Sequence, residues 1–167
     1  IAFLLFLSYF ILKAVPSMGL EPTHLVTYGA SANTIEGDDD FLQVVFIRVP
    51  ADMAKPLYIR IFDADCGGNL DARYSKKWDT RTRFRLFGGK GAYSSPGLKQ
   101  RTPPPSDLSA GVLISDETFG QDPFRDSQWH TFAKALPKKG EKIGKFLYFK
   151  LVVEGKEGDD GNRFSLA

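Results

Sequence analysis

Apolar and polar residues alternate with the period of a β-strand along much of the chain after Pro16. From Leu57 to Ile61 every second residue is aliphatic, which predicts a strand covered fully on one face and partly on the other. Two further runs, 41–49 and 146–154, are richer still in apolar residues. Strands are predicted at residues 25–28, 41–49, 57–63, 80–87, 111–115, 128–132, 146–154 and 162–166.

These runs are separated by turn-forming residues, and no amphipathic helix is apparent after Pro16. The pattern therefore predicts an all-β fold, an antiparallel β-sandwich or jelly roll of seven to eight strands. We expect runs 41–49 and 57–63 to form an antiparallel hairpin. Residues 88–107 are predicted to form a long loop and residues 137–145 a basic turn.

The N-terminus carries an apolar run, residues 1–12, of about the length of a signal-peptide core. Small residues then allow cleavage before Leu20, so we expect residues 1–19 to be a signal peptide and 20–167 the β-sandwich domain. The alternative is a retained membrane anchor or a pilin-type assembly helix. Either way the domain is expected to be secreted or part of the cell envelope. The chain begins with Ile and ends inside a predicted strand, so we expect a fragment of a longer protein.

Composition narrows the possible partners. The net charge is +2 and no basic helix is evident, which argues against nucleic-acid binding. The one cysteine, Cys66, rules out an internal disulfide, and the neighbouring carboxylates disfavour its thiolate. We expect the partners to be other domains of the same polypeptide or a glycan or other cell-surface ligand. Membrane contact is expected only through an uncleaved N-terminal segment.

Acidic residues gather at the ends of predicted strands in three groups. The groups are Glu36, Asp38, Asp39 and Asp40; Asp63, Asp65, Asn69 and Asp71; and Glu157, Asp159, Asp160 and Asn162. Crowded carboxylates repel one another unless solvent or a cation neutralises them, and Ca²⁺ prefers hard oxygen ligands. The predicted Ca²⁺ ligands are Asp63, Asp65, Asn69, Asp71, Asp38, Asp39, Asp159 and Asp160.

The second group does not match an EF-hand loop. Counted from Asp63, the fifth position is Gly67 and the twelfth is Tyr74, where a bidentate Glu belongs. Any calcium site must therefore combine several loops. The alternative is that these residues only form turns, since Asp, Asn and Gly are the commonest turn residues.

Residues 38–71 resemble the bacterial extracellular modules of the pre-peptidase C-terminal type. The resemblance rests on the acidic turn Asp38-Asp39-Asp40-Phe41, a strand ending at Val49-Pro50, and a second strand closing on Asp63-Ala64-Asp65. It implies a β-sandwich that accompanies a secreted enzyme and binds Ca²⁺ at its acidic loops. It also implies that Asp63 and Asp65 ligate that ion.

Two loop aromatics and a row of arginines allow other functions. Trp78 and Tyr93 lie in predicted loops and are candidate ligand contacts of a carbohydrate-binding module, whereas Trp129 lies within a strand pattern and is expected in the core. Arg81, Arg83 and Arg85 share one strand face. That row suits an anionic ligand, but pairing with acids on neighbouring strands is the commoner arrangement and is favoured here.

No catalytic motif is present: the chain lacks G-x-S-x-G, H-E-x-x-H and dinucleotide-binding patterns. A His-dependent site would have to use His24 or His130, and a glycoside hydrolase using paired carboxylates is the remaining catalytic alternative. We therefore expect an exported, non-catalytic binding or structural module of a larger secreted or cell-surface protein.

Overall fold

The computed structural model describes residues 23–27, 42–74, 76–99, 106–158 and 160–167. Its strands are β1 (Thr23–Thr27), β2 (Leu42–Pro50), β3 (Leu57–Phe62), β4 (Arg81–Gly88), β5 (Val112–Phe119), β6 (Trp129–Ala135), β7 (Glu141–Ile143), β8 (Phe146–Glu157) and β9 (Ser165–Leu166). Two short 3₁₀ helices, η1 (Pro96–Lys99) and η2 (Pro137–Lys139), complete the described elements.

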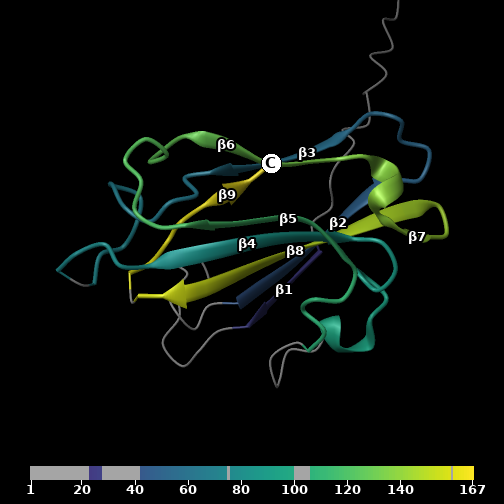
Figure 1. Ribbon diagram of the computed structural model, residues 1–167, viewed down its shortest axis with the longest axis horizontal. Coiled ribbons are helices and arrows are strands. Elements are labelled where there is room, and N and C mark those ends of the chain that lie inside the picture. The colour runs from purple at the N-terminus through teal and green to yellow at the C-terminus, as the bar shows by residue number, and fades with distance from the viewer. Residues whose placement is uncertain (1–22, 28–41, 75, 100–105, 159) are drawn as a thin grey trace, which may run out of the picture.

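The strands form two antiparallel sheets (Figure 1). The large sheet has the order β1-β2-β8-β4-β5, with β7 also paired to β8, and the small sheet has the order β6-β3-β9. The predicted all-β, antiparallel architecture is confirmed. Each of the eight predicted strands overlaps an observed one, and β7, inside the predicted basic turn 137–145, is additional.

One apolar core lies between the two sheets. Alternate residues of β3 (Leu57, Ile59, Ile61) pack against β2, β4 and β8 of the large sheet. Phe84 is at the centre, fully buried, with its ring 5.1–6.2 Å from the rings of Phe119, Phe132 and Phe164. The opposite face of β3 is only partly covered, as the alternation predicts: Tyr58 and Arg60 are exposed and Phe62 is half-buried.

Part of the second face of the large sheet, over β2, β8 and the end of β4, is covered by the segment between β4 and β5. Leu98 of η1 packs on Val44 and Phe46, and Ala92 packs on Phe87 and Val152. Strands β2 and β8 are thus buried on both faces, which explains the uninterrupted apolar runs at residues 44–47 and 146–149.

Two buried charged groups hold this covering segment in place. Lys150 of β8 is fully buried and donates to the backbone oxygens of Asp107 (3.2 Å) and Ala110 (2.7 Å). Burial, followed by the charge of Arg85, lowers the pKa of Lys150 to about 8. At the start of the covering segment, Glu141 accepts hydrogen bonds from the N–H groups of Gly91, Tyr93 and Ser94.

The predicted hairpin between residues 41–49 and 57–63 is wrong. Strand β2 pairs with β1 and β8, whereas β3 pairs with β6 and β9 in the other sheet. Residues 51–56 therefore cross from one sheet to the other instead of closing a hairpin. Alternation alone reports which face of a strand is buried and not which strand lies beside it.

Trp129 was expected in the core, and this prediction is also wrong. It is 44% exposed on the outer face of the small sheet, with the Arg60 guanidinium 4.8 Å from its ring centre. The register between β3 and β6 shifts at Ile59/Arg60, so Phe132 and Ala133 are both buried. A bulge of this kind reverses which alternate residues face inward.

The predicted signal peptide or anchor, residues 1–19, lies outside the described residues. Within the described residues, no helix is long and apolar enough to cross a membrane.

Replacing Phe84 tests whether the shared core holds the sheets together. We expect Phe84→Ala to lower the free energy of unfolding by about 3–5 kcal/mol, because it leaves a cavity among three rings. Phe124→Ala, at a ring that is 93% exposed, should change it by no more than about 0.5 kcal/mol. Denaturant titration of both variants measures this, and equal losses would contradict the core assignment.

Candidate metal centre at the acidic pole

Three loops meet at one end of the two sheets: residues 63–80, 120–128 and 158–164 (left side of Figure 1). The Asp63 N–H donates to the Gln128 backbone oxygen at 3.0 Å, and Ala72 and Gly161 exchange two backbone hydrogen bonds. The loops bring together five carboxylates, which we call the acidic pole: Asp63, Asp65, Asp71, Asp126 and Asp160. Two of the three acidic groups of the sequence therefore converge here.

Asp63 and Asp65 lie at the centre of the acidic pole. They are 0% and 1% exposed, and Asp63 has a φ of 57°, a left-handed conformation that Asp tolerates better than most residues. Asp63 Oδ1 accepts the N–H of Ser127 at 2.6 Å, and Asp65 Oδ2 accepts that of Asp122 at 3.0 Å. The other oxygens, Asp63 Oδ2 and Asp65 Oδ1, have no hydrogen-bond partner among the described residues.

Asp71 and Asp160 are satisfied by backbone donors instead. Asp71 accepts the N–H groups of Gly67 (2.6 Å) and Arg163 (2.7 Å). Asp160 accepts those of Tyr74 (2.6 Å) and Asp79 (3.2 Å). Both carboxylates thus hold the 63–80 loop in shape and join it to the loop that follows β8.

Asp126 and Asn162 complete the surroundings. The Asp126 carboxylate lies so close to Gly68, which has a φ of +74°, that a Cβ there would collide with it. Asn162 is fully buried and donates to the Ala64 backbone oxygen at 3.2 Å, while its own Oδ1 has no partner among the described residues. Asp126 was missed by the sequence prediction because it lies in the β5–β6 loop, which has no acidic run.

Burial and mutual repulsion raise the pKa values of the carboxyl groups here. Desolvation is the main cause for Asp63 and Asp65, and the charge of Asp126 adds to it. Desolvation likewise raises the pKa of Asp71 to about 7, with smaller contributions from Asp63 and Asp65. Burial also raises the pKa of Cys66 to about 12, in agreement with the expected non-nucleophilic thiol.

The remaining predicted ligands are placed as follows. Asn69 is exposed at the turn of the 63–80 loop, whereas Asp38, Asp39 and Asp159 lie outside the described residues. Among the residues that are described, no group of three or more His, Cys, Asp or Glu side chains is arranged to hold a metal ion. The acidic pole therefore has unpartnered buried oxygens, but its described residues do not form a preformed metal site with three carboxylate ligands.

The two predicted ligand aromatics do not share a site. Trp78 is half-buried beside Gly67 at the acidic pole. Tyr93 belongs to the segment that covers the large sheet, where its ring stacks on Tyr148 at 4.0 Å and meets the edge of Phe46 at 5.2 Å. A flat sugar platform made from both rings is not present.

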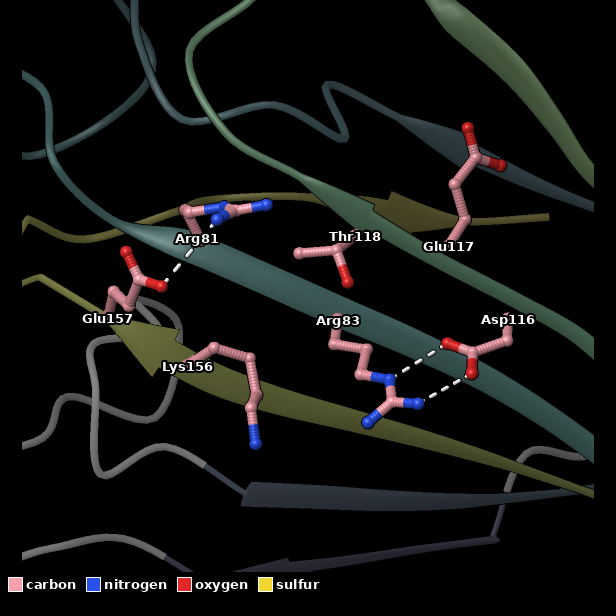
Figure 2. Close-up of a pocket in the computed structure, with 7 residues that line it drawn as sticks. All are labelled: Arg81, Arg83, Asp116, Glu117, Thr118, Lys156 and Glu157. Carbon is pink, nitrogen blue, oxygen red and sulfur yellow. Dashed lines mark hydrogen bonds and ion pairs between the residues drawn. The ribbon is translucent and has the colours of Figure 1, made fainter.

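The arginine row borders a shallow surface groove of about 400 Å³ on β4, β5 and β8 (Figure 2). Arg83 is joined to Asp116 by two hydrogen bonds of 2.8 and 2.6 Å, and Arg81 lies 3.5 Å from Glu157. Arg85 pairs with Glu154 of β8. Pairing with cross-strand acids is thus confirmed. Since Glu117 and Lys156 also line the groove, its three basic and three acidic groups balance and do not favour an anion.

His130 has both ring nitrogens engaged. Its Nε2 lies 3.0 Å from Glu117 Oε2, and its Nδ1 lies 3.0 Å from Arg125 Nη1. Arginine only donates, so Nδ1 is the acceptor and Nε2 carries the proton toward Glu117. These contacts join β5, β6 and the loop between them.

Comparisons of the chain with protein-family models, with curated proteins and with solved structures found no match.

The raised pKa of Asp71 predicts a pH dependence of stability in the presence of chelator. With a folded pKa of about 7 against 3.8 unfolded, the folded state binds more protons between these values. The free energy of unfolding should therefore fall from pH 4 to pH 7, relative to Asp71→Asn, by up to about 4 kcal/mol. Denaturant titration at several pH values measures the difference.

Asp116→Asn is the control for this measurement. Its pKa is lowered, mainly by the hydrogen bond from Arg83, so its contribution changes below pH 4. The difference between wild type and this variant should be flat from pH 4 to pH 7. A flat difference for Asp71→Asn as well would show that Asp71 is not desolvated.

Proposed function

We propose that this chain is a non-catalytic β-sandwich module, of the jelly-roll class expected from the sequence, which binds Ca²⁺ at the acidic pole and is stabilised by it. The observation that carries the proposal is the pair of buried carboxylate oxygens, Asp63 Oδ2 and Asp65 Oδ1, without a donor among the described residues. The role as a structural or accessory unit of a larger exported protein follows the sequence resemblance and is part of the same proposal.

An unpartnered buried carboxylate oxygen is costly. Leaving a buried acceptor unsatisfied costs about 1–3 kcal/mol, and more when the group is charged. Two such oxygens separated by one residue, with Asp126 beside them, multiply that cost through repulsion. Protonation or a bound cation removes this cost, and a cation does so without requiring the carboxylates to take up protons.

The chemistry of the donors favours Ca²⁺ over other metals. The available atoms are carboxylate oxygens of Asp63 and Asp65 and the amide oxygen of Asn162, all hard ligands. Cys66 is nearby but its high pKa keeps it a thiol, which disfavours Zn²⁺ and Cu⁺. Asp126, only partly buried, supplies a further carboxylate from the opposite loop once its side chain rotates.

Binding there would join separate parts of the fold. Asp63 and Asp65 follow β3, Asp126 precedes β6, and Asn162 precedes β9, so one ion would tie together all three strands of the small sheet. Because the site exists only in the folded state, ion binding adds directly to the free energy of unfolding.

Thermal melting with calcium and with chelator tests the proposal. At a free Ca²⁺ concentration of about 100 times the dissociation constant the gain is about 2.7 kcal/mol, or a rise in Tm of roughly 5–10 °C. The dissociation constant expected for an extracellular module is about 0.1–1 mM. Mg²⁺ at the same concentration should give a much smaller rise, and an unchanged Tm with Ca²⁺ would remove the metal from the proposal.

The double substitution Asp63→Asn and Asp65→Asn locates the site. Asn tolerates the left-handed backbone at position 63 and removes both charges, so this variant should melt higher than wild type in chelator and show no response to Ca²⁺. The matched control, Asp116→Asn with Glu157→Gln, removes two exposed charges from β5 and β8 and should keep the full response. Loss of the response in the control alone would place the ion elsewhere.

A further inference from the structure

Five lysines gather at the end of the molecule opposite the acidic pole. They lie in the turn after β2 and in the segments around η2 and β7, at the right of Figure 1. We call this set the lysine pole: Lys55, Lys138, Lys139, Lys142 and Lys145. All five side chains are exposed, and none forms an ion pair with a described residue.

The acids nearby do not neutralise this charge. Among residues 50–56 and 136–146 the only carboxylates are Asp52, which is exposed, and Glu141, which is buried and committed to the N–H groups of the covering segment. The chain as a whole carries only +2, so the lysine pole is a local concentration and not the consequence of a basic protein.

An apolar groove of about 500 Å³ lies between these lysines. Its lining includes Met53, Leu136, Pro137 and Leu147, with Lys138 and Lys142 at the same opening. Two aliphatic side chains also stand in solvent here, Leu136 (44% exposed) and Ile143 (37% exposed). Apolar side chains surrounded by lysines are the composition of surfaces that bind the interface of an anionic membrane.

We propose that the lysine pole docks on the surface of an anionic phospholipid bilayer. The lysines come from separate turns at the tip of the sheets, so they can face one plane together, with Leu136 and Ile143 entering the headgroup region. All five are Lys and none is Arg, which favours diffuse headgroup charge over the bidentate recognition of a carboxylate in an acidic peptide.

The charge distribution of the whole molecule supports the same orientation. The acidic pole lies at the far end, so the domain carries a charge asymmetry along its strands that turns the lysine pole toward a negative surface. This proposal does not depend on Ca²⁺ binding, since the two sites share no residue. It also rests only on described residues and not on the apolar run at 1–12.

Sedimentation with vesicles tests the proposal, using the full chain in the presence of chelator. Vesicles of phosphatidylglycerol and phosphatidylcholine in roughly equal amounts are compared with vesicles of phosphatidylcholine alone. We expect binding to the anionic vesicles that weakens as salt is raised. Lys142→Gln with Lys145→Gln should lower the partition coefficient about 25-fold, because each lysine near the surface contributes a factor of about five.

The matched control is Lys76→Gln with Lys156→Gln, two exposed lysines away from the lysine pole. It changes the net charge equally and should lower the partition coefficient less than about threefold, because distant charges are screened. If Lys142→Gln with Lys145→Gln does not fold, as judged by its melting midpoint, Lys55→Gln with Lys138→Gln takes its place with the same expectation.

Leu136→Ser with Ile143→Ser tests the apolar part, and it should reduce the binding that persists at high salt. Equal binding of wild type and the lysine variants would overturn the proposal. Binding of a polyglutamate peptide without binding of anionic vesicles would overturn it in favour of an acidic protein partner.

Discussion

The burial of strands β2 and β8 on both faces is the constraint on which the rest of this structure depends. One face of β2 and β8 packs against the small sheet, and the other packs under the segment that carries η1. Lys150 and Glu141 are buried to hold that segment, although each must give up hydration to do so. With both faces of these central strands covered, the accessible clusters of like charge lie at the ends of the strands.

The two ends have opposite chemistry for this reason. At one end the loops after β3, β5 and β8 bring carboxylates together, and at the other the turns around β7 bring lysines together. The carboxylates come from three separate loops, whereas all the lysines except Lys55 lie in the basic segment 137–145. The exposed side of the large sheet, by contrast, pairs its arginines with acids from neighbouring strands and leaves no excess of either charge.

The acidic pole contains two carboxylates whose oxygens are hydrogen-bonded and two that each have an unpartnered oxygen among the described residues. Asp71 and Asp160 have backbone donors on both oxygens and shape the loop, whereas Asp63 and Asp65 each keep one buried oxygen without a partner. Desolvation raises the pKa of Asp71 to about 7, and the neighbouring charges of Asp63 and Asp65 add to this rise. A bound cation would relieve the repulsion and complete the coordination of the unpartnered oxygens in one step.

The sequence by itself determined the strands and the class of fold, because the alternation of buried residues is a local property. Residues 57–61 show it without reference to any other strand. It also placed Asp63, Asp65 and Asp71 in one loop, since spacing along the chain is local too. Only the tertiary structure decided that β2 and β3 lie in different sheets, that a bulge turns Trp129 outward, and that Asp126 joins Asp63 and Asp65. It likewise brought Lys55 to the same end of the molecule as the lysines of the basic turn 137–145. Such pairings depend on which faces bury together in three dimensions, and a pattern read along one strand contains no information about the strand that packs against it.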